Sequence, residues 1–306
     1  MSKRFRTTRH ALAAAAATAA LSLTLSACGS GTNSDHTSAM PGMDHSASPS
    51  PSGSSDDMAS MPGMGPASTG NGLADTKDGY RMTSTAATLP AGQTADYRFT
   101  VTGPDGKPVT AFAVDQTQRM HFYAIRSDLT GFQHLHPTMA RNGTWTAPLA
   151  ALQPGTWRLY ASFTPDNGVG KGKDFVLSRT VKVPGTAMPS PLPKASDTAT
   201  VDGYSVTVKG EPMAGMAHQL TATVAKDGKP VTDLQPYLDT YAHLTAFHQD
   251  NLAFAHLHPT TKVNGDHGGP TLNFHAEFAQ SGDWRLFLQF QTGGKLHTAA
   301  LTLHVS

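Results

Sequence analysis

Short stretches in which apolar and polar residues alternate recur through the second part of the chain. They are clearest at residues 96–102, 157–163 and 284–290, and a period of two is typical of a strand with one buried face. Turn sequences such as Pro-Asp-Gly, Asp-Asn-Gly and Gly-Gly separate these stretches. The pattern predicts an all-β protein with about seven short strands in roughly 110 residues, as in an antiparallel β-sandwich of immunoglobulin or cupredoxin type.

One sequence pattern occurs twice. The hexapeptide Asp-Gly-Lys-Pro-Val-Thr at residues 105–110 recurs unchanged at 227–232, and this offset of 122 gives 14 identities over the 33 positions from 105 to 137. Further along, Gly-Thr-Trp-Arg-Leu-Tyr at 155–160 matches Gly-Asp-Trp-Arg-Leu-Phe at 282–287. The chain is therefore predicted to hold two tandem β-sandwich domains.

The domain boundaries follow from this duplication. We expect repeat 1 to span residues 75–184 and repeat 2 to span residues 197–306, with Trp157 and Trp284 filling the two cores. A proline-rich, semi-rigid linker, residues 185–196, joins them.

Each repeat carries three histidines in the same arrangement. His134 and His136 lie two residues apart, so a strand projects both from one face, and His121 precedes them by 13 residues. Residues 120–126 and 132–136 can pair as a hairpin, with partner numbers that sum to about 255–257, which sets His121 opposite His134 or His136. The counterparts in repeat 2 are His243, His256 and His258.

Two interpretations of these trios stay open. Three imidazoles with one free position are a typical ligand set for Cu(II) or Zn(II). Alternatively, the histidines stabilise the hairpin by hydrogen bonds and by packing against an aromatic ring and Asp128. In repeat 2, His275 or His297 is a candidate fourth ligand, and Met213 and Met216, in a glycine-containing loop, are candidate soft ligands.

The first residues have the pattern of a secretory signal. Four basic residues in the first nine positions precede an apolar run, Ala11 to Leu25, which is shorter than the roughly 20 residues of a membrane span. This predicts a signal peptide over residues 1–27. Leu25-Ser26-Ala27-Cys28 resembles a bacterial lipobox, which implies cleavage before Cys28 and its acylation, for example by palmitate. A secreted protein with a chance cysteine is the alternative.

The segment that follows, residues 28–74, is rich in Ser, Gly, Pro and Ala, and we expect it to be a disordered tether. Thioethers favour Cu(I) and imidazoles suit Cu(II) or Zn(II), so its Met and His clusters are candidate ligands; a low-complexity linker without metal is the alternative. The candidate tether ligands are His36, Met40, Met43, His45, Met58, Met61 and Met64.

Composition excludes several functions. Without the four basic residues of the signal, 19 basic residues face 22 acidic ones, which argues against nucleic-acid binding. The single cysteine rules out an internal disulfide framework and a cysteine-based zinc site. Because no carboxylate near either trio is an obvious general base, we expect no catalysis.

The pattern His121…His134-Leu135-His136-Pro137…Gly155-Thr156-Trp157-Arg158-Leu159-Tyr160, present in both repeats, resembles that of YtkA-like β-sandwiches and periplasmic copper-binding proteins. With its lipobox, the chain looks like an actinobacterial-type lipoprotein. The resemblance implies a protein on the outer face of the cell membrane, held there only by its lipid, that buffers, sequesters or delivers copper, or zinc. Its partner would be an envelope metal-handling protein. The alternative is a non-catalytic envelope interaction module whose histidines are structural.

Overall fold

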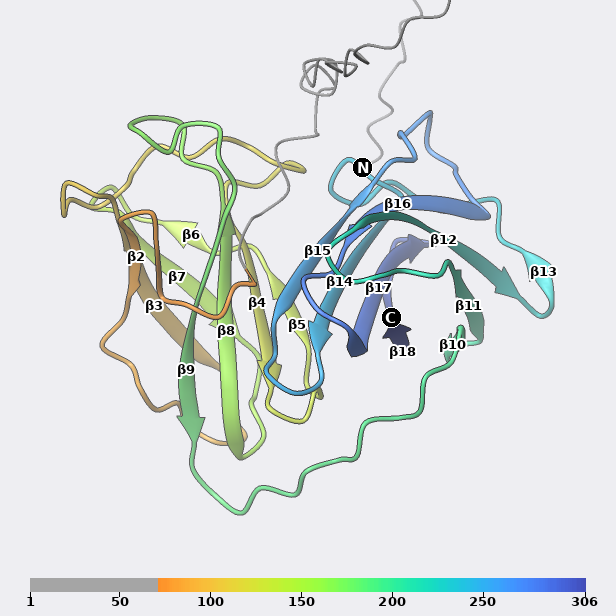
Figure 1. Cartoon of the computed structure of the whole chain (residues 1–306), viewed down its shortest axis with the longest axis horizontal. Coiled ribbons are helices and arrows are strands. Elements are labelled where there is room, and N and C mark those ends of the chain that lie inside the picture. Colours follow the sequence, from red (N-terminus) through yellow and green to blue (C-terminus); the bar gives the residue numbers. More distant parts are fainter. Residues whose placement is uncertain (1–70) are drawn as a thin grey trace, which may run out of the picture. The chain divides into compact units, whose positions relative to one another are not determined.

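A computed structural model describes residues 71–306 (Figure 1). Over this range the chain forms strands, turns and bends without a helix, which confirms the predicted all-β fold. In this part of the chain, accordingly, nothing qualifies as a membrane-spanning helix. The predicted signal peptide, the predicted lipidation site Cys28 and all seven candidate tether ligands lie outside the described residues.

Repeat 1 consists of two antiparallel sheets. Their strand orders are β1-β2-β3-β7-β6 and β5-β4-β8-β9. The strands are β1 (Thr76–Lys77), β2 (Tyr80–Thr83), β3 (Ala95–Thr102), β4 (His121–Arg126), β5 (Gln133–Leu135), β6 (Thr138–Met139), β7 (Thr144–Leu149), β8 (Gly155–Phe163) and β9 (Phe175–Val183).

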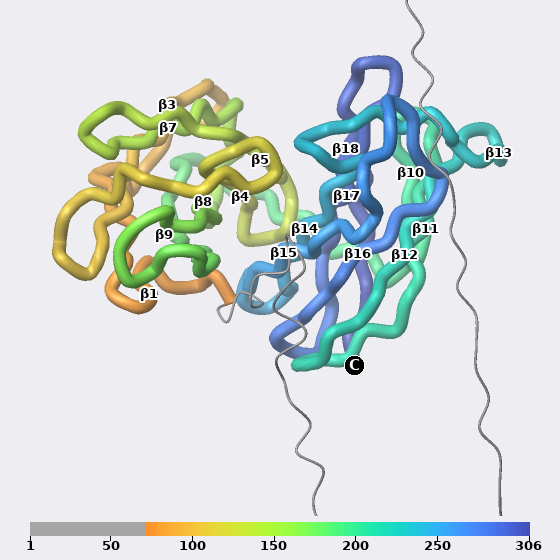
Figure 2. Tube along the Cα trace, turned by 90° about the horizontal axis from the view of Figure 1, so that it is seen from above, coloured from red at the N-terminus to blue at the C-terminus, as the bar shows by residue number. Residues whose placement is uncertain are grey.

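In repeat 2 the strands belong to one sheet, β10-β11-β12-β16-β15-β14-β17-β18, with β13 on β12 (Figure 2). The sheet is continuous because β15 extends to Pro259 and pairs with β16, whereas β5 ends at Leu135. The strands are β10 (Thr198–Val201), β11 (Tyr204–Lys209), β12 (Ala217–Lys226), β13 (Lys229–Pro230), β14 (Ala242–His248), β15 (Phe254–Pro259), β16 (Thr271–Glu277), β17 (Gly282–Thr292) and β18 (Lys295–Val305).

Each repeat has its own apolar core. Trp157 lies in the core of repeat 1 and Trp284 in that of repeat 2, as the sequence predicted. Each indole N–H donates to a carbonyl four residues earlier, that of Gln153 at 2.8 Å and that of Gln280 at 3.1 Å. The buried ring therefore leaves no unpaired polar atom.

The strands that carry His121 and His243 are buried on both faces. Strand β4 is buried from His121 to Ile125, and all seven residues of β14 are buried. One face of these strands covers the core of its own repeat. The other face contributes to a third apolar cluster, which contains buried residues of both repeats: Tyr123, Ile125, Leu129, Tyr160, Val176, Phe247, Phe254 and Phe287.

Contacts within this third cluster join the two repeats, which belong to one compact unit of the chain. Phe132 stacks on Phe287 with ring centres 4.2 Å apart and planes 8° apart. The Tyr160 hydroxyl donates to the carbonyl of Leu252. Aromatic burial of this kind stabilises a contact strongly, so the outer faces of the histidine hairpins are shielded from solvent.

Residues 71–74, expected at the end of the tether, lie against the folded part. The Phe254 amide donates to the carbonyl of Asn71 at 2.8 Å, and Arg158 donates to the carbonyl of Leu73 at 2.7 Å. Leu73 also packs against the core of repeat 2. This segment thus contacts both repeats, because its backbone carbonyls and its one large aliphatic side chain find partners there.

Candidate metal centre

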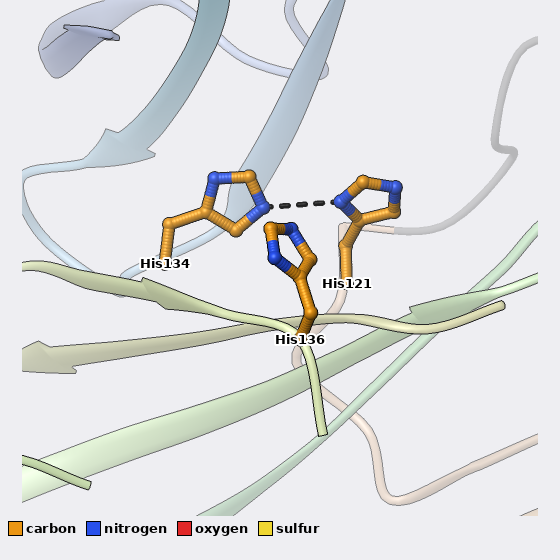
Figure 3. Close-up of side chains that lie close together, drawn as sticks. All are labelled: His121, His134 and His136. Carbon is orange, nitrogen blue, oxygen red and sulfur yellow. Dashed lines mark hydrogen bonds between the residues drawn. The ribbon is translucent and has the colours of Figure 1, made fainter. Parts of the chain in front are cut away.

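The predicted hairpin forms in repeat 1, and its register brings the first trio together. Phe122 pairs with Leu135 and Tyr123 with His134, so paired numbers sum to 257, within the predicted range. Since residues two apart share a face of a strand, this register places His134 and His136 on the same side as His121. Figure 3 shows the three rings converging.

The distances within this trio suit a shared ion. The ring centres are 5.3 Å apart for His121 and His134, 5.2 Å for His121 and His136, and 4.8 Å for His134 and His136. One nitrogen of each ring lies within 4.8 Å of the others. Three imidazoles bound to one ion at the usual 2.0–2.1 Å would have ring centres roughly 5 Å apart. Small side-chain rotations would therefore complete the coordination.

The hydrogen bonds of His121 and His134 leave one ring nitrogen of each without a hydrogen, and these two nitrogens face each other. The Nε2–H of His121 donates to the carbonyl of Asp115 at 3.1 Å, and the Nδ1–H of His134 donates to Oε1 of Gln289 at 2.7 Å. A neutral imidazole has one N–H, so the other nitrogen of each ring carries a lone pair. Those two nitrogens, Nδ1 of His121 and Nε2 of His134, are 3.0 Å apart. The Nε2 atom of His136 is buried without any hydrogen-bond partner.

Burial also keeps these rings neutral. It is the main cause that lowers the pKa of His121, lowers the pKa of His134 well below the ordinary 6.5, and lowers the pKa of His136 to about 4. The neighbouring imidazoles lower the pKa values of His134 and His136 further. At neutral pH all three rings therefore have the unprotonated form that binds a metal ion.

The second trio does not form a matching site. The Nε2–H of His243 donates to the carbonyl of Tyr237 at 3.2 Å, while its Nδ1 atom and the Nε2 atom of His256 are buried without partners. His256 and His258 have ring centres 4.8 Å apart. Within residues 71–306, only the trio of repeat 1 brings three His or carboxylate donors within 4.8 Å of one another. The prediction of two equivalent trios is therefore corrected.

Instead, histidines of repeat 2 adjoin the trio of repeat 1. The ring centre of His243 lies 5.7 Å from that of His134 and 6.2 Å from that of His121, and the ring centre of His256 lies 6.3 Å from that of His121. The reason is that the outer faces of the two hairpins meet at the contact between the repeats. A cavity of about 30 Å³ adjoins His121, His256 and His258 there, enough for a water molecule.

The other candidate ligands have protein partners. The Nε2 atom of His275 contacts Glu277 at 3.3 Å. The buried His297 contacts Asp202 through Nδ1 at 2.8 Å and the Thr292 hydroxyl through Nε2 at 3.0 Å. Both nitrogens of His297 thus have partners within the protein.

Two residues that contact the histidine trio were not among the candidates predicted from sequence. Gln289 hydrogen-bonds His134 across the contact, and the ring of Tyr123 stacks on that of His134 with centres 4.5 Å apart. The alignment of the two repeats could have identified Gln289, because this residue aligns with Ser162 of repeat 1. A small polar residue in one repeat and a long one in the other at the same strand position identifies a place at which the repeats are not equivalent.

Fold and site together define a class: tandem antiparallel β-sandwich proteins with a histidine cluster where the repeats meet. The chain belongs to the family described as "Domain of unknown function (DUF8832)", which matches residues 75–181 and again residues 199–306. No curated protein matches the chain.

Solved structures show distant similarity. The chain is similar to the Escherichia coli adhesin FdeC, with 15% identity and a TM-score of 0.24, over 76% of this chain and 65% of that one. It is similar to Yersinia pseudotuberculosis InvD with 14% identity and a TM-score of 0.24, over 76% of this chain and 58% of InvD. The chain thus spans less than two thirds of either protein. TM-scores this low carry no argument about function.

Proposed function

We propose that this protein binds a transition-metal ion, Cu(II) or Zn(II), at His121, His134 and His136. One observation carries the proposal: the bare nitrogens of His121 and His134 face each other across 3.0 Å beside the unpartnered Nε2 atom of His136. Lone pairs so close repel each other, and a buried polar atom without a partner costs free energy. A cation among the three nitrogens would remove both penalties.

The fourth donor of this centre would come from repeat 2. The Nδ1 atom of His243 is buried and unpartnered, and its ring lies beside those of His134 and His121. Burial is the main cause that lowers the pKa of His243 to about 3, so this ring too is neutral. An ion held by both repeats would stabilise their contact in addition to the apolar cluster.

The cellular role follows from the sequence. A lipid at Cys28 would hold the protein on the outer face of the cell membrane. There it would buffer, sequester or deliver metal to another envelope protein without catalysis. The methionines of the tether would bind Cu(I). Copper is favoured over zinc because the repeats resemble YtkA-like and periplasmic copper-binding proteins.

The test is a comparison of metal stoichiometry in the full chain. Purified protein would be loaded with Zn(II), desalted and analysed by mass spectrometry, as parent, as the triple variant His121→Ala/His134→Ala/His136→Ala, and as His136→Gln. The control is His267→Ala/His304→Ala, which changes two exposed histidines. We expect both trio variants to bind one ion fewer than the parent and the control to bind as many. Equal stoichiometry in parent and in folded His136→Gln would refute the proposal.

A second function is favoured by a different observation. Both ring nitrogens of His121 and of His134 contact protein atoms, and His134 stacks on Tyr123. Under this alternative the histidines are structural, and the protein is an envelope interaction module. Unfolding in the presence of a chelator separates the two: a structural role predicts that His136→Gln destabilises the metal-free protein, whereas a ligand role predicts destabilisation only of the metal-loaded protein.

A further inference from the structure

A second feature, remote in sequence from the trio, lies in the turn before β12. Met213 is 43% exposed and Met216 is 52% exposed, so both thioethers are accessible from solvent. The two residues are the ends of one turn, in which the Met216 amide donates to the Met213 carbonyl at 3.4 Å. Their α-carbons are therefore within about 7 Å of each other.

His218 follows this turn directly in the chain. It lies two residues after Met216 and is the second residue of β12. The Nε2 atom of His218 is buried and has no hydrogen-bond partner. The segment from Met213 to His218 thus carries two exposed thioethers and one unpaired imidazole nitrogen.

The backbone of this turn is fixed. The Ala214 amide donates to the carbonyl of Ser306 at 2.8 Å, and the Gly215 amide donates to the carbonyl of Phe278 at 2.8 Å. Gly215 has a φ of 72°, in the left-handed region that glycine adopts without strain. Ala214 packs against the core of repeat 2. A fixed backbone with exposed methionines is preorganised for a ligand.

Repeat 1 contains the same turn without these side chains. Its Gly92 has a φ of 68° and its amide donates to the Leu152 carbonyl at 2.9 Å, as that of Gly215 does to Phe278. Counting from these glycines, Met213, Met216 and His218 stand where repeat 1 has Pro90, Gln93 and Ala95. The strand pairings agree, because Ala95 faces Leu149 and His218 faces Ala276. The turn therefore forms without a thioether or an imidazole.

From this we infer that Met213, Met216 and His218 form a separate site for a soft monovalent cation, Cu(I). Thioether sulfur selects Cu(I) over divalent ions, and one imidazole completes a three-coordinate set. The site is independent of the trio and differs from it in kind: its two thioethers are exposed and suit the reduced ion. It would give repeat 2 a means of exchanging copper that repeat 1 lacks.

The test is methionine oxidation resolved by residue, in the full chain. Ag(I) is the probe, because it is a soft monovalent ion that does not change its oxidation state under these conditions. The protein is exposed to dilute peroxide in chloride-free buffer, with and without saturating Ag(I), and peptides are quantified by mass spectrometry. Met188, which is 80% exposed and has no histidine in this arrangement, is the internal control.

We expect Ag(I) to slow oxidation of Met213 and Met216 at least about five-fold and to leave Met188 unchanged, since a bound sulfur lone pair is unavailable to the oxidant. The His218→Ala variant, which copies repeat 1, should require about ten-fold more Ag(I) for the same protection. The His136→Gln variant should keep the same protection at the same Ag(I) concentration, which would show that this site does not depend on the trio. Equal protection of all three methionines, or of none, would overturn the inference.

Discussion

The Nδ1 atom of His134 lies 2.7 Å from the Oε1 atom of Gln289, although the two residues are 155 positions apart and belong to different repeats. Gln289 pairs with His243 across the sheet, as Ser162 pairs with His121 in repeat 1. A glutamine reaches across the contact, whereas a serine is too short. The hairpins therefore differ, and only His134 has its ring orientation and tautomer fixed by the other repeat.

Replacing Gln289 with the residue of repeat 1 should weaken the metal centre. In Gln289→Ser the Nδ1–H of His134 loses its acceptor, and loss of such an outer-shell partner typically costs 10–100-fold in metal affinity. We expect a loss of about ten-fold or more in Zn(II) affinity, measured by competition with a chelating dye. Gln219→Ser is the control, because Gln219 is exposed and bonds Asn273 within repeat 2. An unchanged affinity in Gln289→Ser would show that this bond does not orient a ligand.

Acid should destabilise the metal-free protein from about pH 6.5 downward. The pKa of His136 is lowered to about 4 and that of His243 to about 3, whereas both are near 6.5 in the unfolded chain. Below pH 6.5 the unfolded chain binds more protons than the folded protein, so the free energy of unfolding falls as pH falls. His243 alone gives a slope of up to about 1.4 kcal/mol per pH unit.

Urea unfolding in chelator at pH 7, 5.5 and 4.5 measures this slope. His243→Gln should show a shallower slope, and His304→Gln, which changes a largely exposed ring, should match the parent. A parent whose stability is flat from pH 7 to 4.5 would contradict the neutral, buried state of these histidines.

The ion pair of Arg126 and Asp128 should stabilise the hairpin turn and the linker. Its closest atoms are 2.6 Å apart, and the side chains are 13% and 9% exposed. Although burial alone would raise the pKa of Asp128, hydrogen bonds from Arg126, the Ser190 amide and Thr130 hold that pKa below its usual range. Asp128→Asn should cost about 3 kcal/mol of unfolding free energy, since it leaves a mostly buried guanidinium unpaired.

Asp166→Asn is the matched control for this variant. Asp166 pairs with Lys171 at 3.6 Å, and both side chains are more than half exposed, so its loss should cost under about 1 kcal/mol. Similar losses in the two variants would show that burial does not strengthen the Arg126 pair.

The stacking of Phe132 on Phe287 should determine whether the repeats unfold together. In Phe287→Ala the contact loses this stack, which should cost about 3 kcal/mol. We expect one calorimetric unfolding transition in the parent and two in the variant, as each repeat has its own core. Val169→Ala, at an exposed position, should keep one transition. Two transitions already in the parent would show that the repeats fold independently.

Much of the hairpin could be predicted from sequence because its geometry is local. The spacing of His134 and His136 and a short turn suffice to place both near His121, and the register followed within the predicted range. The contact of His297 with Asp202, by contrast, could not be predicted, because Asp202 comes from a different hairpin. Sequence spacing holds no information about such a contact.

The sequence by itself determined the strands, the duplication and the shared face of each histidine trio, because alternation, turn residues and repeated motifs are properties of short segments. Only the tertiary structure decided that the two hairpin faces meet, so that two predicted sites become one cluster with a glutamine and a histidine from repeat 2 beside it. That outcome depends on how aromatic surfaces more than 100 residues apart pack together. The continuous apolar run of Phe122 to Ile125 was the one local sign that this strand is covered on both faces.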